Sequence, residues 1–525
     1  MLTARRGLIQ HRLFGLPLHP LLAAAYPVVF LFATNAAEQV TLSPLWRPLA
    51  LSVSTTAATL VSLRLITGGW HRAALLATIL VIGFFGYGHV WNAVGDRLDS
   101  QWPLIGAWTL LVTIGLYAAW RFRRWAPRAT PALNLVAAVL LLMNAWGLTQ
   151  AVVALGAPEA PRGIELTSLD LAPASGELPD VYYIVPDRYG GSSALAEAYE
   201  FNNEPFLRAL EERGFAIARH AHANYIKTPL SLVSALNMDF LDDDALVGEQ
   251  RSGADDGPIN RRLRERLTVP AALKEIGYQY LHVANWWEPS ATNVDADRTF
   301  RYDGQDEFSS ALAQTTLLRA LDEPQQAAQD RYGRDVFRQH TLYELETLEA
   351  IAETAGPKFV FAHLLIPHDP YVFDIDGSPV LWSEEEGLGR IESYGRQLAY
   401  TNARLLALVE RITEADEDAV ILLMADEGPL PGARGTHELG GFRWRTATDM
   451  ELEGKFGILL AMRVPGADLE QAGFHDSITA VNAWRVIFNA RFGTDLPMLP
   501  DRAWAHESLY QFFDFFEITD RLDTG

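Results

Sequence analysis

The hydrophobic pattern divides the chain into two parts that belong in different solvents. Within the first 155 residues, stretches of 25 residues at 13–37, 23 at 73–95 and 21 at 100–120 contain no charged side chain. An apolar helix needs about 20 residues to cross the hydrocarbon core of a membrane. We therefore predict a transmembrane domain over residues 1–155. Its five helices are expected at about 17–37, 45–66, 73–95, 101–121 and 131–155.

The second of these spans is the shortest, because only 16 residues separate Arg47 from Arg64. Arginine stems can lie along apolar surface while their guanidinium groups reach the headgroup layer, which lengthens the span. A cleaved signal peptide is the alternative interpretation of the first apolar stretch. That stretch exceeds the usual apolar core of a signal peptide, and no small-residue cleavage site follows it.

The distribution of arginines predicts how these helices are oriented. Residues 1–155 contain 11 arginines, no lysine and 3 acidic residues. In a five-pass arrangement only Arg47 and Arg97 fall on one side, and the other arginines fall on the opposite side. Because basic loops stay on the cytoplasmic side, we expect the amino terminus inside and the region after residue 155 outside. The chain is thus predicted to be a multi-pass protein of the cytoplasmic membrane.

The pattern after residue 155 is that of a soluble domain. Residues 156–179 mix Pro, Gly, Ala and Ser without periodicity and are typical of a linker. From residue 180 to 525, short apolar runs alternate with amphipathic helical patterns such as those at 194–214 and 393–412. This alternation predicts an extracytoplasmic α/β domain with a mainly parallel sheet and helices on both faces. Its strands are expected at 180–187, 277–285, 358–369, 419–428 and 456–466.

Composition narrows the chemistry of this outer domain. The whole chain carries a formal charge of −22, and residues 1–155 contribute +8, so the remaining 370 residues carry −30. A surface this acidic repels polyphosphate backbones and excludes nucleic acid as a partner. The chain has no cysteine. The domain must therefore be stabilised by an ordinary core rather than by disulfides.

Polar residues lie at the ends of several predicted strands. Asp187 ends the first run, and Asp426 and Glu427 end the run at 419–428. In open parallel sheets, ligands bind beyond the carboxyl ends of the strands. Alone, each of these acids is also compatible with a helix cap or a solvated turn. Together with Thr228 they form a set that suits a hard divalent cation, Mn²⁺ or Mg²⁺, better than Ca²⁺ or Zn²⁺.

Thr228 is followed by Pro229 and an apolar-periodic run, which is a typical helix start with threonine at N-cap and proline at N1. An ordinary cap is the simpler interpretation. The functional hypothesis is that the hydroxyl lies at the positive end of the helix, beside N–H groups that suit a phosphate. Thr228 would then attack phosphorus as a nucleophile, with its alkoxide stabilised by the bound cation.

Histidines and tryptophans provide candidates for a substrate pocket. His368 lies in a proline-bounded turn, and His282 and Trp287 lie near the end of the run at 277–285. Core packing is the alternative for each of them. His363 lies inside a predicted strand and is interpreted as a core histidine, whereas His437 lies in a glycine-bounded loop with no identifiable partner.

Four segments then carry a resemblance when they are taken in chain order. They are "VYYIVPDRYG", "NYIKTPLSL", "FAHLLIPHDPYVFD" and "ILLMADEGP". Following five predicted spans, this set resembles the membrane-anchored sulfatase-like hydrolases and transferases of the alkaline phosphatase superfamily. Lipoteichoic acid synthase and phosphoethanolamine transferases are members of that group. The resemblance implies an alkaline phosphatase/sulfatase-like fold, metal positions at Asp187, Thr228 and Asp426, and pocket positions at His282, Trp287 and His368.

Two departures from the family pattern affect the site. Glu427 stands where the family has a histidine ligand, which favours Mg²⁺ or Mn²⁺ further but adds negative charge. Glu288 and Pro289 follow Trp287 where glycerol-phosphate transferases have an arginine. Sulfatase activity proper is disfavoured, because the formylglycine that it needs is made from Cys or Ser, whereas this site has Thr228.

The predicted function is therefore metal-dependent transfer of a phospho-headgroup, phosphoglycerol or phosphoethanolamine-like, through a covalent threonine intermediate. The donor is expected to be a membrane phospholipid and the acceptor a cell-envelope glycan or lipid. One alternative is a phosphomonoesterase or phosphodiesterase that hydrolyses envelope phosphoesters. Another, from a different class, is an inactive envelope binding or sensor protein that keeps the fold.

Overall fold

In the computed structural model, the chain forms two compact units. One comprises residues 1–158 and 305–333, and the other residues 159–304 and 334–525. The structure describes residues 16–35, 42–98, 100–155, 178–241, 256–265, 267–304, 306–321, 333–430, 442–507 and 513–522, with Leu169, Leu171 and Leu246. Most of the predicted linker and the candidate His437 lie outside these residues.

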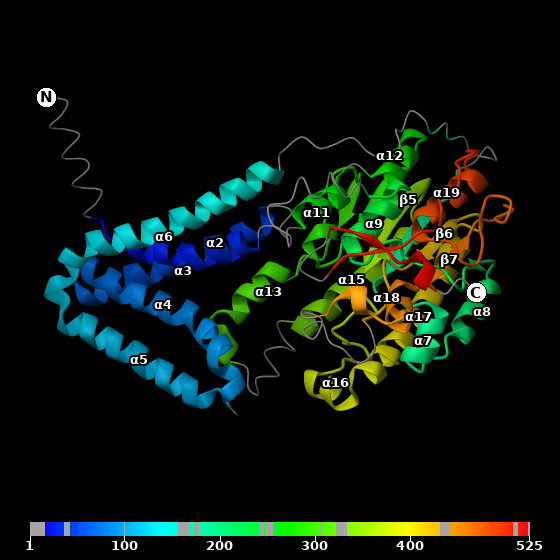
Figure 1. The fold of residues 1–525 in the computed structure, drawn as a ribbon. Helices are drawn as coiled ribbons and strands as arrows, with labels where there is room; N and C mark the ends of the chain where they lie inside the picture. Colours follow the sequence, from blue (N-terminus) through cyan, green and yellow to red (C-terminus); the bar gives the residue numbers. More distant parts are fainter. Residues whose placement is uncertain are drawn as a thin grey trace, which may run out of the picture. The chain divides into compact units, whose positions relative to one another are not determined.

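The first unit is helical (Figure 1). Its long helices are α2 (His19–Thr34), α3 (Ser43–Thr67), α4 (Trp70–Val94), α5 (Trp102–Arg121) and α6 (Ala126–Leu155). Within the described residues, four segments are long and apolar enough to cross a membrane, namely Ser43–Thr67, Trp70–Val94, Trp102–Arg121 and Arg123–Thr149. Helix α2 is apolar but shorter, at 16 residues.

The first unit also contains a segment from far along the chain. Helix α13 (Glu307–Gln314) and the 3₁₀-helix η5 (Leu317–Leu321) pack on the long helices. Phe308 joins a buried apolar cluster with Val28 and Phe32 of α2. The Gly88 N–H of α4 donates to Thr315 O at 3.1 Å. A Cβ at Gly88 would lie 2.4 Å from Gln314 O, so only glycine permits this approach.

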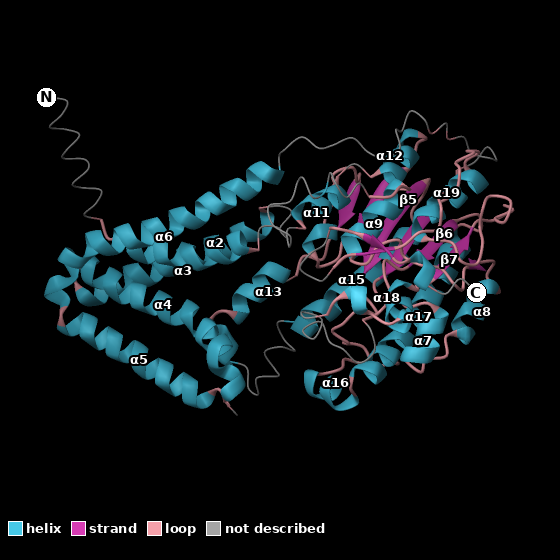
Figure 2. Ribbon diagram, in the orientation of Figure 1, coloured by secondary structure: helices cyan, strands magenta, loops and turns pink. Residues whose placement is uncertain are grey.

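The second unit is built on a mixed sheet of seven strands in the order β2-β7-β6-β1-β5-β3-β4. Figure 2 shows the strands in magenta among helices. Strands β1, β3, β4, β5 and β6 run parallel, whereas β7 pairs antiparallel with both β6 and β2. Their bounds are β1 Val181–Pro186, β2 Ala216–Ile217, β3 Gln279–Val283, β4 Arg298–Phe300, β5 Lys358–Leu364, β6 Val420–Met424 and β7 Leu460–Arg463. A separate pair is formed by β8 (Trp504–Ala505) and β9 (Phe516–Glu517).

Helices surround this sheet and bury it. They are α7 Ser192–Ala198, α8 Glu204–Glu211, α9 Thr228–Asn237, α11 Gly257–Arg264, α12 Thr268–Glu275, α15 Asp335–Ala352, α16 Trp382–Leu388, α17 Arg390–Ala415, α18 Asp449–Phe456 and α19 Ala480–Arg491. Every residue of β1, β5 and β6 is buried. Strands covered on both faces are expected to be continuously apolar, and this is the pattern from which they were predicted.

The fold class predicted from the sequence is confirmed: apolar amino-terminal helices precede a mostly parallel α/β domain. The run at 456–466 does form a strand, but β7 is antiparallel, which an apolar run cannot reveal. The single helical pattern at 194–214 forms two helices, α7 and α8, with a break at residues 199–203. Pro205 lies in the first turn of α8, where its missing N–H costs nothing.

Candidate functional site

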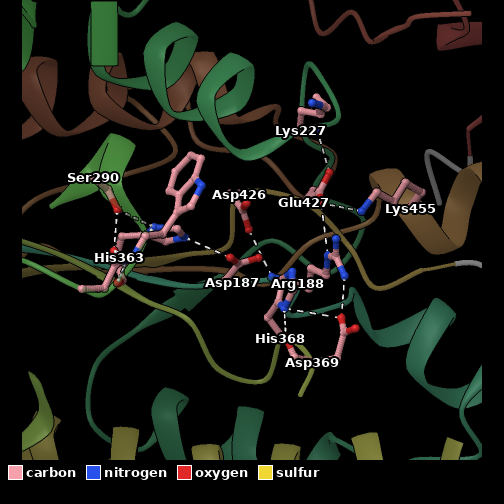
Figure 3. Close-up of polar contacts among 12 residues, drawn as sticks. Asp187, Arg188, Lys227, Ser290, His363, His368, Asp369, Asp426, Glu427 and Lys455 are labelled. Atoms are coloured by element: carbon pink, nitrogen blue, oxygen red, sulfur yellow. Dashed lines mark hydrogen bonds and ion pairs between the residues drawn. The ribbon is translucent and has the colours of Figure 1, made fainter. Parts of the chain in front are cut away.

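Three neighbouring parallel strands bring Asp187, His363 and Asp426 together (Figure 3). Strand β1 lies between β5 and β6, and Asp187 follows directly after β1. His363 is the sixth residue of β5, and Asp426 lies two residues beyond β6. One ligand atom from each of these side chains lies within 4.8 Å of the others. The strand ends thus form a group that can hold a metal ion.

The polar atoms of this group fit a cation. Asp187 and Asp426 are 3% and 0% exposed, and their Oδ1 and Oδ2 atoms respectively have no hydrogen-bond partner within the described structure. His363 Nε2 lies 3.2 Å from Asp187 Oδ2. A buried carboxylate oxygen without a partner is costly, since it has lost its hydration without replacement. A divalent cation with oxygen and imidazole ligands would satisfy both carboxylates.

The two carboxylates have opposite pKa shifts. Burial raises the pKa of Asp426 to about 7, and the charges of Asp187 and Glu427 reinforce that effect. Burial also acts to raise the pKa of Asp187, but His368, His363 and Arg188 outweigh it and lower this pKa to about 2. The shift at Asp426 thus reflects burial first and neighbouring negative charge second, and a bound cation would offset both by stabilising the ionised carboxylate.

Thr228 lies beside this group at the start of α9, where its side chain is near enough to the Asp426 carboxylate to act against the rise in the pKa of Asp426. The prediction of a helix start is correct, but the register differs by one residue. Lys227 occupies N-cap, and Thr228 and Pro229 are the first two helical residues. Lys227 has φ of 82°, a left-handed value that is strained for a non-glycine residue. This sharp entry orients the first turn of α9 toward Asp426.

Glu427 points away from the possible metal ligands Asp187, His363 and Asp426. Its Oε1 lies 2.5 Å from Lys455 Nζ and 3.3 Å from Arg188 Nε, and its Oε2 accepts from the Lys227 N–H at 2.7 Å. Burial acts to raise the pKa of Glu427, but Lys455 and Arg188 reverse the effect and lower it. Figure 3 shows Asp187 and Asp426 of the predicted set together, and Glu427 in an ionic cluster with Lys455 and Arg188. Thr228, also of that set, lies beside Asp426 at the start of α9.

That cluster contains basic residues which sequence reasoning did not select. Arg188 follows Asp187, donates its backbone N–H to Asp426 Oδ1 at 3.1 Å, and pairs through Nη1 with Asp369 Oδ1 at 2.7 Å. Lys455 comes from α18 and is 3% exposed. The tight "DRYG" turn after β1 was a signal for Arg188. Nothing in the sequence near Lys455 indicated that this helix reaches the site.

The predicted pocket residues have different environments. His282 is 2% exposed, with Nε2 2.8 Å from Ser290 O and Nδ1 3.2 Å from Tyr280 Oη, so both nitrogens are occupied. Trp287 is half-buried, and its ring lies edge-on to His363 with 6.0 Å between centroids. His368 is half-buried, and its Nδ1 contacts Asp369. His363, interpreted from the sequence as a core residue, is instead part of the metal-competent group.

Comparison with known proteins gives one family. A family model described as sulfatase matches residues 179–451, just over half of the chain. No curated protein matches the chain. The chain is similar to the C-terminal periplasmic domain of EcEptC from Escherichia coli, with 16% identity, a TM-score of 0.41, and coverage of 68% of this chain and 97% of that one.

Two further solved structures show weak similarity. The integral membrane protein lipooligosaccharide phosphoethanolamine transferase A from Neisseria meningitidis has 12% identity and a TM-score of 0.39, and the match covers 88% of this chain and 94% of that one. A protein in the alkaline phosphatase superfamily from Vibrio parahaemolyticus has 11% identity and a TM-score of 0.39, with 70% and 81% covered.

Proposed function

Because the chain belongs to the sulfatase family, we propose that it transfers a phospho-headgroup from a membrane phospholipid to a cell-envelope glycan or lipid, with Thr228 as the nucleophile. One observation carries this proposal: Thr228, in the first turn of α9, lies beside Asp426, which belongs to a buried group with Asp187 and His363. A hydroxyl placed at a metal-competent group and a helix amino terminus suits attack on phosphorus.

Asp187, His363 and Asp426 would hold the divalent cation, for which Mn²⁺ and Mg²⁺ remain the favoured ions. When bound, the cation would lower the pKa of the threonine hydroxyl and offset negative charge on the phosphoryl oxygens. The imidazole ligand makes Zn²⁺ a stronger competitor than a site of carboxylates and hydroxyl alone would. Measurement of the bound ion decides between Mn²⁺, Mg²⁺ and Zn²⁺.

The proposed reaction consists of two successive displacements at phosphorus. Thr228 Oγ forms a bond to phosphorus as the bond from phosphorus to the diacylglycerol oxygen breaks; the threonine proton leaves to solvent and the released oxygen gains one. An acceptor hydroxyl then attacks phosphorus, and Thr228 recovers its proton. The N–H groups of the first turn of α9 face the transferred phosphate, and half-buried His368 supplies a polar contact to it.

The same proposal includes the location of the catalytic domain relative to the membrane. The arginine distribution favours an amino terminus inside and the domain from residue 180 outside, with residues 1–155 as the transmembrane domain and 156–179 as the linker. In that arrangement the donor would be a lipid of the outer leaflet. Reaction of a cysteine introduced at Glu346 with an impermeant thiol reagent on intact cells tests the orientation, because the native chain has no cysteine.

The decisive experiment looks for the covalent intermediate. Purified full-length protein is incubated with Mn²⁺ and phospholipids that carry an isotopically labelled headgroup, and intact-protein mass spectrometry is used to find an added mass. We expect an adduct on wild type and on Thr228→Ser, and none on Thr228→Ala. The adduct mass identifies the headgroup. Absence of any adduct on wild type, together with no diacylglycerol release, contradicts the proposal.

The same reaction separates transfer from hydrolysis. Release of the free phospho-headgroup from the adduct, with water as acceptor, would identify a phosphodiesterase. Formation of a new phosphodiester on an added glycan or lipid would identify a transferase. Failure to bind any divalent cation would instead favour a binding or sensor protein.

A further inference from the structure

A membrane-embedded groove in the helical unit is a second place with the features of a ligand site. The groove has a volume of about 480 Å³ and is lined by residues of α2, α4 and α6. All of these helices belong to the first unit, whereas Thr228 and its neighbours belong to the second. The groove is therefore a separate feature from the catalytic group described above.

One face of each helix contributes to the groove. On α2 the lining residues begin at His19 and continue through Ala23 and Tyr26 to Phe30, which is the spacing of one helical face. Phe30 lies eleven positions after His19, which at 1.5 Å per residue is about 16 Å. The hydrocarbon core of a membrane is about 30 Å thick, so the groove is as long as one leaflet is deep.

Apart from the histidines at either end, Thr78 and the Tyr26 hydroxyl, the lining is apolar, with aliphatic and aromatic side chains from all three helices. An empty apolar space of this size forfeits dispersion contacts, and water inside it would lack polar partners along most of its length. Within a bilayer, the molecule available to fill such a groove is a hydrocarbon chain.

A buried imidazole closes one end. His19 is 1% exposed, its Nδ1 lies 2.6 Å from Thr78 Oγ1, and its Nε2 has no hydrogen-bond partner within the described structure. Asn134 fixes this end of α2, because its Oδ1 accepts from the His19 N–H at 2.8 Å. If the Thr78 hydroxyl donates to Nδ1, Nε2 carries the proton and is a hydrogen-bond donor directed at a ligand.

We propose that this groove binds one acyl chain of a membrane glycerophospholipid, with an ester carbonyl of that lipid accepting a hydrogen bond from His19 Nε2. The chain lies between α2, α4 and α6 and ends near Phe30. Under the orientation proposed above, His19 lies near the cytoplasmic face, so the bound lipid belongs to the inner leaflet. The donor of the transfer reaction belongs to the outer leaflet, and the two lipids are different molecules.

The test uses full-length protein in nanodiscs that contain phosphatidylglycerol with a photoreactive diazirine on one acyl chain. After illumination, crosslinked peptides are mapped by mass spectrometry. We expect crosslinks concentrated on residues 19–30 and 78–89. Crosslinks spread evenly over all five helices, including exposed α5, would overturn the proposal and indicate ordinary contact with the surrounding bilayer.

Variants sharpen the result. Ala23→Phe fills the groove and is expected to reduce crosslinking on α2 and α4 about tenfold, the loss that a 1.4 kcal/mol weaker affinity produces. Ala107→Phe adds the same side chain on exposed α5 and should leave the yield unchanged. Ala137→Phe fills the groove from α6 and replaces Ala23→Phe if that variant fails to fold. Unchanged crosslinking in a folded groove-filling variant contradicts the proposal.

The polar contact is tested separately. His19→Gln keeps an N–H donor near this end of the groove and is expected to retain crosslinking, whereas His19→Ala should lower it. Adduct formation at Thr228 is measured in parallel, so failure of the groove proposal is distinguishable from failure of the proposed function. Equal crosslinking in His19→Ala and wild type would show that the imidazole makes no contact with the lipid.

Discussion

The Lys455 ammonium nitrogen lies 2.5 Å from Glu427 Oε1, and both side chains are almost fully buried, at 4% and 5% exposure. This pair explains how the site accommodates a glutamate where related enzymes are expected to have a histidine. Lys455 and Arg188 neutralise the added negative charge. The glutamate therefore orders the basic residues around the site, and its carboxylate is not available to the Asp187 group in this arrangement.

Breaking this pair is predicted to destabilise the protein. Removing one member of a buried ion pair leaves an uncompensated charge and costs about 3–5 kcal/mol. We expect Glu427→Gln and Lys455→Met each to lower the thermal unfolding temperature of the full-length protein. The double variant Glu427→Gln/Lys455→Met should recover much of the loss. Additive losses in the double variant would show that the two side chains do not interact.

Metal affinities of single variants are predicted to distinguish the proposed ligands from Glu427, which is not a ligand in this proposal. Asp187→Asn, His363→Ala and Asp426→Asn each alter a member of the group, and we expect each to weaken Mn²⁺ binding about 100-fold or more. Glu427→Gln should weaken it by only about tenfold, the lower end of the roughly 10–100-fold that changes next to a metal's ligands usually cost. Isothermal titration of the purified protein gives these affinities. A loss in Glu427→Gln equal to that in Asp426→Asn would identify Glu427 as a ligand.

The acid Glu344 is predicted to make stability depend on pH. This residue of α15 is 1% exposed, and burial raises its pKa well above the ordinary value of 4.5. Below that ordinary pKa, Glu344 is protonated in both the folded and the unfolded state. Its ionisation therefore takes nothing from the free energy of unfolding in that pH range. As pH rises, the unfolded chain ionises first, and stability falls by up to about 1.4 kcal/mol per pH unit until the folded pKa is reached.

Replacing Glu344 with Gln removes this dependence. We expect the unfolding temperature of Glu344→Gln to fall less than that of wild type between pH 5 and pH 8, on the scale given by the linkage relation. Exposed Glu346 on the same helix is the control, and Glu346→Gln should follow wild type. Parallel pH profiles of wild type and Glu344→Gln would show that Glu344 ionises in the folded protein.

The backbone of Gln314 and Thr315 lies so close to Gly88 that we predict no larger side chain can be accommodated at this position. A leucine there would force its Cβ into the backbone of Gln314 and Thr315, so Gly88→Leu should detach the α13–η5 segment from α4 and lower the unfolding temperature in detergent. Gly106 on α5 is the matched control, because a Cβ added there would meet no other atom within 4 Å, and Gly106→Leu should melt close to wild type. Equal melting of both variants would contradict the contact.

Family membership confirms the resemblance to sulfatase-like enzymes that the ordered motifs indicated. The same motifs suggested a role for Glu427 as a ligand, because adjacent acids at a strand end are chemically equivalent in a sequence. In the structure the two side chains point to different partners: Asp426 toward Thr228 and Asp187, Glu427 toward Lys455. Sequence cannot assign that choice, because Lys455 lies 28 positions further along the chain.

The sequence by itself determined the features that depend on local pattern. Charge-free stretches specify the apolar helices, continuous apolar runs specify buried strands such as β1 and β6, and Thr228-Pro229 specifies the start of α9. Tertiary structure alone decided which side chains meet. His363 reads as a core histidine in β5, and only the pairing of β5 with β1 places it beside Asp187. The physical reason is that strand order and helix placement depend on how the whole domain buries its apolar surface. A sequence motif predicts only the local conformation of its own segment.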